Sequence, residues 1–217
     1  MSLPQLLAYG LPGLPLAVLG LPLYVYLATF YARDLLLGTG TVGAILLVAR
    51  LFDVVTDPLA GYVSDHWPRQ DWRRRGPMVL GMPWLLLGIW MLFLPPPGIG
   101  GGWLLLGTLL AYLGWTLVSI PYAAWGAELS DDYHERSRLA ASREGFQALG
   151  VLLALVLPTW AGIAENAGAS LRLLFFAVLL TLVPTVLLAV RLLPESVQLF
   201  GGRLSWPDCV SLAPTAP

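Results

Sequence analysis

Three charged side chains lie in a segment that is otherwise apolar enough to cross a membrane. Arg50, Asp53 and Asp57 occur in the sequence Ala-Arg-Leu-Phe-Asp-Val-Val-Thr-Asp-Pro, which begins at Ala49. Their i, i+3, i+7 spacing places all three on one face of a helix. Each charged residue near the centre of a membrane helix costs about 2.5–3.5 kcal/mol on the insertion scale. We therefore expect this face to point into a helix bundle or a water-filled cavity.

Two carboxylates one helical turn apart repel each other in a medium of low dielectric constant. A proton on one of them, a cation between them or the Arg50 guanidinium would relieve the repulsion. Because carboxylate and hydroxyl oxygens suit a hard cation, we predict a site for Na⁺ or H⁺ at Asp53 and Asp57, with hydroxyl oxygens from Thr56 and Thr116. The alternative is an Arg–Asp pair that only fixes helix packing. One aspartate would suffice for that pair, which favours the cation site.

Other side chains in the apolar segments are candidates for a substrate path. The aromatic rings of Tyr24 and Trp115 fit such a path, although aromatic rings in membrane helices more often pack or lie at interfaces. Ser119 is small and polar in mid-segment, and cavity lining or helix–helix hydrogen bonding explains it equally well. With 1 Cys and 2 His, the chain has no Cys/His spacing that indicates a metal site of that kind.

The elements that must position these residues are six membrane-spanning helices. About 20 apolar residues in a helix cross a bilayer core, and six stretches satisfy this requirement. They are Leu6–Ala32, Val42–Val63, Met78–Leu94, Trp103–Trp125, Phe146–Ala164 and Leu171–Leu192. Glycine, proline or charged residues interrupt them, and the polar stretch Glu128–Glu144 is expected as a solvated surface helix between two spans.

Composition agrees with an all-α integral membrane protein. Of 217 residues, 57% are hydrophobic and 12% charged, about half of the charged share that a soluble domain usually carries. The lipid bilayer is therefore the expected partner. The net charge of −1 gives no reason to expect nucleic acid, and no cofactor is expected apart from the coupling ion.

Arginine placement predicts the orientation of the chain. Arg69 and Arg73–Arg75 lie between the second and third spans, Arg136, Arg138 and Arg143 lie between the fourth and fifth, and Arg191 ends the sixth. The opposite loops hold only Arg33 and Arg172. By the positive-inside rule both termini face the cytoplasm, as in a bacterial-type inner membrane.

The chain divides into a bundle and a tail. We expect residues 1–194 to form the six-helix bundle, built from two three-helix repeats at about 1–95 and 103–194. Pro22 and Pro121 lie in the first span of each unit, as repeats of this kind would leave them, although proline is common in membrane helices. Residues 195–217 are rich in Pro and Gly, which predicts a poorly ordered tail.

Two segments carry a resemblance to a known family. The sequence ARLFDVVTDPLAGYVSD from Ala49, followed by WRRRGP from Trp72, resembles the second span and cytoplasmic loop of the glycoside–pentoside–hexuronide:cation symporter family, the melibiose-permease-like branch of the major facilitator superfamily. SIPY from Ser119 and ELSDDYHER from Glu128 resemble that family's fourth span and following loop. The resemblance covers about residues 9–194 and implies the N-terminal half of a twelve-helix transporter.

The resemblance also implies roles for individual residues. Asp53 and Asp57 would bind the coupling cation, Thr116 matches the family's hydroxyl ligand, and Thr56 stands where melibiose permease has an amide ligand. Arg143 matches an arginine on the substrate side of the fifth span. The gating and structural positions are Arg50, Gly61, Asp65, Arg73, Arg74 and Arg75, and of these Asp65 and the three consecutive arginines would pair across helix ends in the inward-closed state.

Two departures from the family pattern bear on function. Melibiose permease holds sugar hydroxyls with acidic residues in spans one and four, where this chain has Ala17 and Ser119. A glycoside or sugar is the first expectation for the solute, and a lysolipid or another non-sugar solute is the alternative. The chain also matches one half of a transporter, so we expect a second six-helix half or a second copy as partner, or else a truncated membrane protein that does not transport.

An enzyme is the least favoured interpretation. Intramembrane aspartyl proteases also carry two membrane aspartates, but they place them on facing helices so that a water molecule lies between them. Here both aspartates occur in one predicted helix. No nucleophile and base accompany them, so the pattern favours ion binding over catalysis.

Overall fold

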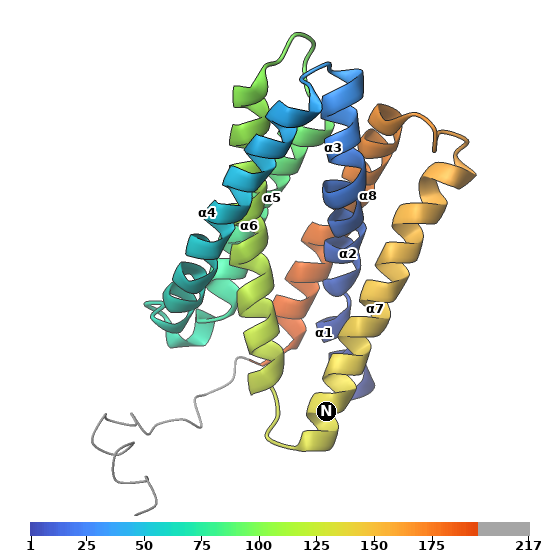
Figure 1. The fold of residues 1–217 in the computed structure, drawn as a ribbon. Coiled ribbons are helices and arrows are strands. Elements are labelled where there is room, and N and C mark those ends of the chain that lie inside the picture. Colours follow the sequence, from blue (N-terminus) through green and yellow to red (C-terminus); the bar gives the residue numbers. More distant parts are fainter. Residues whose placement is uncertain (195–217) are drawn as a thin grey trace, which may run out of the picture.

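The computed structural model describes residues 1–194, and within them every regular element is a helix (Figure 1). We call each helical segment of about membrane length a rod, whether it is one helix or several consecutive short ones. The first rod consists of α1 (Leu3–Gly10), α2 (Gly13–Leu21), η1 (Pro22–Tyr26), α3 (Leu27–Thr29) and η2 (Phe30–Asp34), of which η1 and η2 are π-helical turns. The remaining elements are α4 (Thr39–Asp65), the short 3₁₀ turn η3 (Gln70–Trp72), α5 (Arg75–Phe93), α6 (Gly101–Glu128), α7 (Tyr133–Trp160) and α8 (Ala167–Leu192). The predicted tail, residues 195–217, lies outside the described residues.

The bundle consists of six rods, each of about the length that crosses a membrane, which confirms the predicted all-α membrane class. Five helical segments of the described chain are long and apolar enough to span a bilayer, namely Leu3–Leu21, Arg75–Phe93, Gly101–Glu128, Tyr133–Trp160 and Ala167–Leu192. The sixth rod is α4, which has 27 residues and is therefore about 40 Å long. It is also the helix that carries Arg50, Asp53 and Asp57.

The fifth rod differs from the prediction at both ends. The polar stretch Glu128–Glu144 is not a separate surface helix, because α7 begins at Tyr133 and continues without a break into the apolar part. The carboxylate of Asp132 accepts a hydrogen bond from the backbone N–H of His134 at 2.9 Å and caps the new helix. At the other end α7 stops at Trp160 rather than Ala164, and Gly162 follows with a positive φ of 69°.

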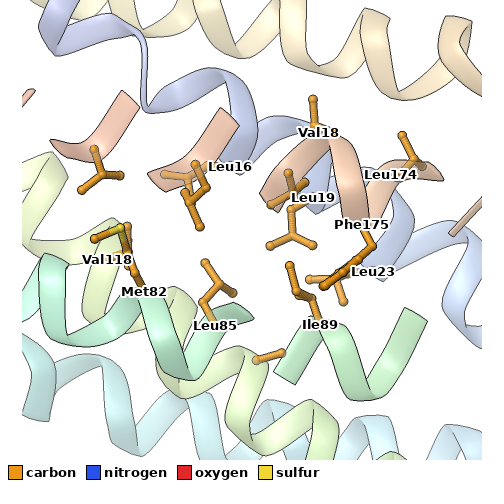
Figure 2. Packing of buried hydrophobic residues seen from close by; sticks show 14 of the residues in the cluster. Leu16, Val18, Leu19, Leu23, Met82, Leu85, Ile89, Val118, Leu174 and Phe175 are labelled. Atoms are coloured by element: carbon orange, nitrogen blue, oxygen red, sulfur yellow. The ribbon is translucent and has the colours of Figure 1, made fainter. Parts of the chain in front are cut away.

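The helices associate in two groups (Figure 1). The helices α4, α5 and α6 pack together, and the first rod packs with α7 and α8. Contacts between α5 and α8 join the groups, and α8 also packs on α2 within its own group. Figure 2 shows this junction, where Leu19 of α2, Leu85 and Ile89 of α5 and Phe175 of α8 lie close together.

Glycines allow α5 and α6 to approach closely. A Cβ atom on Gly88 of α5 would collide with the backbone of Ala111, and one on Gly114 of α6 would collide with the backbone of Leu85. Small residues at such crossings increase van der Waals contact between membrane helices. This close crossing fixes α6, and with it Thr116, relative to the rest of the bundle.

Four helices, α4, α5, α7 and α8, keep apolar side chains that no other described residue covers. On α4 these side chains include Leu51, Val54 and Val55, and on α7 they include Leu152 and Val156. Apolar surface of this extent is stable next to lipid or next to another protein surface. The polar stripe of α4, in contrast, is turned toward α6.

Candidate functional site

The helices α4 and α6 lie side by side (Figure 1). Between them, Asp53, Asp57 and Thr116 come together. The Thr116 hydroxyl oxygen is 3.1 Å from Oδ1 of Asp53 and 2.8 Å from Oδ1 of Asp57. Thr116 is buried, and both carboxylates are partly buried. Three oxygens of the types that hard cations prefer therefore lie within reach of one another.

The charges of this cluster do not balance when both aspartates are ionised. The Thr116 hydroxyl has a single hydrogen and can donate it to only one carboxylate. The other carboxylate oxygen then faces an oxygen lone pair about 3 Å away, and a negative charge remains next to the first carboxylate. A proton on one carboxylate or a cation among the oxygens removes this repulsion.

Arg50 neutralises only one of the two aspartates. Its Nη1 lies 3.3 Å from Oδ2 of Asp53, and its guanidinium lies 5.2 Å from the ring centre of Tyr112. The Arg50 side chain is 44% exposed and that of Asp53 is 19% exposed. With Arg50, Asp53 and Asp57 all charged, the stripe carries a net charge of −1.

The Thr56 hydroxyl makes its hydrogen bond within its own helix. It donates to the backbone carbonyl of Asp53 at 3.3 Å, three residues earlier in the same helix. Hydroxyl-to-carbonyl bonds of this kind are a common local arrangement of threonine in helices. The structure therefore turns the Thr56 oxygen toward its own helix backbone, whereas Thr116 from another helix reaches both carboxylates.

A small cavity adjoins the carboxylate cluster. Its volume is about 30 Å³, and Arg50, Asp53, Tyr112 and Trp115 line it together with Gly20 and Leu23 of the first rod. A space of this size accommodates about one water molecule or a small ion. Asp53 thus faces a space between the helices and not the lipid side of α4.

A larger cavity of about 410 Å³ lies next to the small one. The predicted substrate-side residues Ala17, Trp115, Ser119 and Arg143 all line it. Gly20 and Trp115 belong to the walls of both cavities, so the two spaces are neighbours. For Tyr24, the side chain lies outside what the structure describes.

At the arginine-rich end of the bundle, a network of ion pairs joins α4, α5 and α6. Arg73 Nη2 is 2.6 Å from Oε2 of Glu128, and Arg74 Nη1 is 2.8 Å from Oδ1 of Asp65. Arg74 also pairs with Glu128 and donates to the hydroxyl of Ser64 at 2.8 Å. Both arginines are buried, so they depend on these acidic partners for compensation of their charge.

Two further predicted gating positions are Arg75 and Gly61. Arg75 donates to the backbone carbonyl of Leu193 and lies over the ring of Trp125. The indole N–H of Trp125 donates to the carbonyl of Pro194 at 3.1 Å. Around Gly61, no atom of a neighbouring element of the described chain lies within 4 Å of the position of a Cβ.

Glu128 is the site residue that sequence reasoning missed. Its distance along the chain from Arg73 is 55 residues, and nothing in the spacing connects it with the arginines. A signal was nevertheless present, because Glu128 is the first acidic residue after an apolar stretch and so marks the end of a span. Residues 1–194 contain no group of three or more His, Cys, Asp or Glu side chains that could hold a metal ion.

Comparison with known proteins gives the family. A family model described as MFS/sugar transport protein matches residues 8–197. The uncharacterized symporter sll1374 of Synechocystis is 31% identical over 164 residues, which are 70% of this chain and 29% of that protein. The inner membrane symporter YicJ of Escherichia coli is 28% identical over 162 residues, with 72% and 35% covered.

A vertebrate protein is also similar. The sodium-dependent lysophosphatidylcholine symporter 1-B of Danio rerio is 28% identical over 162 residues, which are 70% of this chain and 30% of that protein. The chain thus spans about a third of the length of these relatives. Since the family model matches nearly all of the residues that the structure describes, the chain belongs to the MFS/sugar transport protein family, and the predicted relationship to cation symporters is confirmed.

Proposed function

We propose that this chain supplies the cation site of a secondary transporter that moves a small organic solute together with Na⁺ or H⁺. The observation that carries the proposal is the position of the Thr116 hydroxyl within hydrogen-bonding distance of both Asp53 and Asp57. One cation or proton would compensate the net charge of −1 on the stripe of α4. The relatives support this function because they are named symporters, and one is named sodium-dependent.

The two neighbouring cavities suggest how ion and solute are coupled. Asp53 lines the small cavity, while Arg143 and Ser119 line the large one, and Trp115 belongs to both walls. A cation bound at Asp53 and Asp57 would change the electrostatic potential in the solute cavity and the position of the shared wall. Binding of either partner would then favour the other by the same factor.

The solute remains a choice between two classes. The family description names sugar transport, and a sugar or glycoside is the first candidate. Ala17 and Ser119 supply no carboxylate to hold sugar hydroxyls, and a relative is named for lysophosphatidylcholine. A lysolipid or another non-sugar solute is therefore the second candidate.

Transport by alternating access requires a second bundle that moves against this one. The uncovered apolar faces of α4 and α7 are suitable surfaces for it. We propose that a second six-helix bundle, either another half or a second copy of this chain, packs against these faces. Without such a partner the chain would be a membrane protein that does not transport.

The orientation proposed for the bundle places both termini in the cytoplasm of a plasma (inner) membrane. Met1 pairs with Glu135 at the start of α7, and Leu193 is bound by Arg75 at the start of α5. The first and last described residues thus lie at the arginine-rich end of the bundle. The positive-inside rule assigns this end to the cytoplasm.

Equilibrium binding of ²²Na⁺ to the purified protein tests the cation site. The wild type should bind Na⁺ in a saturable manner, with protons as competitors, and Asp57→Asn should abolish binding. If the proton is the coupling ion, the protein should instead take up protons in a titration, and Asp57→Asn should remove this uptake. Asp71→Asn removes an exposed acid from the η3 turn and should leave both results unchanged. Equal binding by Asp57→Asn and the wild type would refute the site.

A further inference from the structure

An apolar groove runs along the outside of the bundle, where α1 lies beside the first part of α7 (Figure 1). Its volume is about 530 Å³. Apolar residues from both helices form most of the lining, among them Leu3 and Leu7 of α1 and Phe146 and Leu149 of α7. Leu3, Leu7 and Leu149 are exposed, so the groove presents an apolar surface to the surroundings of the bundle.

The contact between α1 and α7 leaves this groove open along one edge. At the closed edge a Cβ atom on Gly10 would collide with Ser142, and the Ser142 hydroxyl donates to the backbone carbonyl of Leu6 at 2.8 Å. At the open edge α7 presents the small residues Ala141 and Gly145. No neighbouring element among residues 1–194 lies within 4 Å of a Cβ position at Gly145. The two helices are thus held together while a space for a long, narrow apolar group remains between them.

The groove has the length of one leaflet and a charge at one end. Arg138 is the charged residue of its lining within the described chain, and it lies near the start of α7 at Tyr133. From Arg138 to Leu149, at the other end, α7 rises about 16 Å. This is roughly half of the hydrocarbon thickness of a bilayer. A guanidinium at the level of the lipid head groups therefore leads into an apolar track that is as deep as one layer of acyl chains.

The positive charge of Arg138 is available for a ligand. The neighbouring arginines of α7, Arg136 and Arg143, each pair with an acidic side chain, whereas Arg138 forms no ion pair within residues 1–194. Glu135 attracts it, but the Glu135 carboxylate already binds the Met1 ammonium group. The Arg138 side chain is exposed, and so it can reach a phosphate at the membrane surface without losing another partner.

We propose that this groove binds an anionic phospholipid of the surrounding membrane, with the head-group phosphate at Arg138 and an acyl chain along Leu3, Leu7 and Leu149. A guanidinium matches the geometry of phosphate oxygens, and basic pockets between membrane helices bind acidic head groups. A zwitterionic head group offers less, because its own cation offsets the charge of the phosphate. The inference goes beyond the proposed function, since it concerns a lipid that stays bound and is not carried.

The groove is separate from the larger cavity that contains Arg143. The two spaces share no described lining residue, and Gly145 lies about 200° around α7 from Arg143. The first rod and α7 nevertheless form walls of both spaces. A lipid in the groove would contact both elements from outside, and because it binds the folded bundle it would stabilise their packing.

Native mass spectrometry of the intact protein in dodecyl maltoside tests the proposal. The protein is titrated with dioleoylphosphatidylglycerol or with dioleoylphosphatidylcholine, which have the same acyl chains and differ in head-group charge. We expect the first phosphatidylglycerol molecule to bind about fivefold more tightly than phosphatidylcholine, as one arginine near a membrane surface supplies. Phosphatidylglycerol should also raise the midpoint of thermal unfolding, and inorganic phosphate alone should not.

A pair of variants examines the head-group contact. Arg138→Gln should bring the affinity for phosphatidylglycerol down to that for phosphatidylcholine. Because Arg138 is exposed, this variant should unfold at the wild-type midpoint when no lipid is added. Arg69→Gln removes the same charge from an exposed position in the loop before η3 and should keep the preference for phosphatidylglycerol.

A second pair examines the track for the acyl chain. Gly145→Leu fills the groove from α7 without meeting a neighbouring element of the described chain, and should abolish the lipid-dependent rise of the midpoint. Gly43→Leu adds the same side chain to α4, where no neighbouring element among residues 1–194 lies within 4 Å of the Cβ position, and should leave the rise unchanged.

Four results would overturn the proposal. The first is equal affinity of the wild type for the two lipids, and the second is a preference for phosphatidylglycerol that persists in Arg138→Gln. The third is a lipid-dependent rise in Gly145→Leu that equals that of the wild type. The fourth is stabilisation by inorganic phosphate as large as that by phosphatidylglycerol, which would indicate a site for free anions and not for a lipid.

Discussion

Thr116 illustrates how one side chain can set the chemistry of a membrane site. Its single hydroxyl hydrogen is presented to two carboxylate oxygens, at 3.1 and 2.8 Å. The cluster is therefore one positive charge short when both aspartates are ionised. On our account a proton or Na⁺ supplies that charge, and the hydroxyl oxygen becomes one of its ligands.

Replacement of Thr116 tests this role. Thr116→Val keeps the shape but removes the oxygen, and should weaken the cation response of the protein by about 10- to 100-fold, as expected for loss of a contact to a charged group. Thr116→Ser should restore most of it. Thr108→Val is the matched control, because the buried Thr108 hydroxyl of the same helix bonds, within the part of the chain that the structure describes, to the backbone carbonyls of Leu104 and Leu105. Thermal unfolding in increasing NaCl measures the response, and an equal loss in both valine variants would count against the role of Thr116.

At the level of single residues, the sequence predicted the acidic pair Asp53 and Asp57 but only part of its surroundings. Asp53 and Asp57 stand out because charge is rare in membrane helices. The link to Thr116 spans 59 to 63 residues, and the sequence indicated it only through the chemistry of a hydroxyl oxygen and through the family resemblance. Thr56 was expected beside the carboxylates because it is adjacent in sequence, yet its hydroxyl bonds to the backbone of its own helix. A short spacing does not reveal where a threonine hydroxyl points.

At the scale of elements, the close crossing of α5 and α6 holds Thr116 in place. Gly114→Val should disrupt this crossing, since a side chain there meets the backbone of Leu85. We expect a destabilisation of about 2 kcal/mol or more, as for overpacking of a close-packed interior, together with loss of the cation response. Gly43→Val on α4 adds the same side chain where no neighbouring element among residues 1–194 lies within 4 Å, and should change little. The unfolding midpoints of the two variants provide the comparison, and equal midpoints would argue against this crossing.

The arginine-rich ends of α4, α5 and α6 depend on Glu128. Glu128→Ala leaves the buried Arg73 and Arg74 with Asp65 as their remaining acidic partner in the described network, and should cost about 3 kcal/mol. Asp131→Asn removes an exposed acid whose distance to Arg136 is 3.6 Å, and should cost less than about 1 kcal/mol. Chemical or thermal unfolding distinguishes the two. A Glu128→Ala protein as stable as the wild type would show that the network contributes nothing to the fold.

The positions of the rods could be predicted from the sequence, whereas their ends and pairings could not. The lengths of the apolar stretches located all six rods, because the thickness of the bilayer sets the length that a membrane-spanning helix needs. The start of α7 was placed too late, since residues from Tyr133 to Glu144 are polar and only the cap at Asp132 shows that they continue the helix. The ion pairs of Arg73 and Arg74 with Glu128 join residues 54 and 55 positions apart, and periodicity carries no signal for such pairs.

For the whole molecule, the account requires one orientation in the membrane. In a protein whose Cys209 is replaced by Ser, a cysteine at Asp71 should react with an impermeant maleimide only after the cells are permeabilised, and a cysteine at Glu165 should react in intact cells. Both positions are exposed in the structure, so access depends on the membrane alone. The reverse pattern would place the arginine-rich end outside and contradict the positive-inside assignment.

The central claim is that a small cation or a proton binds between Asp53 and Asp57. Thermal unfolding of the wild type, Asp53→Asn and Asp57→Asn over a grid of NaCl concentrations and pH values tests it most directly, with choline chloride as the ionic-strength control. We expect the wild-type midpoint to rise with Na⁺ or to shift with pH, and both variants to lose this response while remaining folded. Variants that respond to Na⁺ and pH in the same way as the wild type would contradict the account.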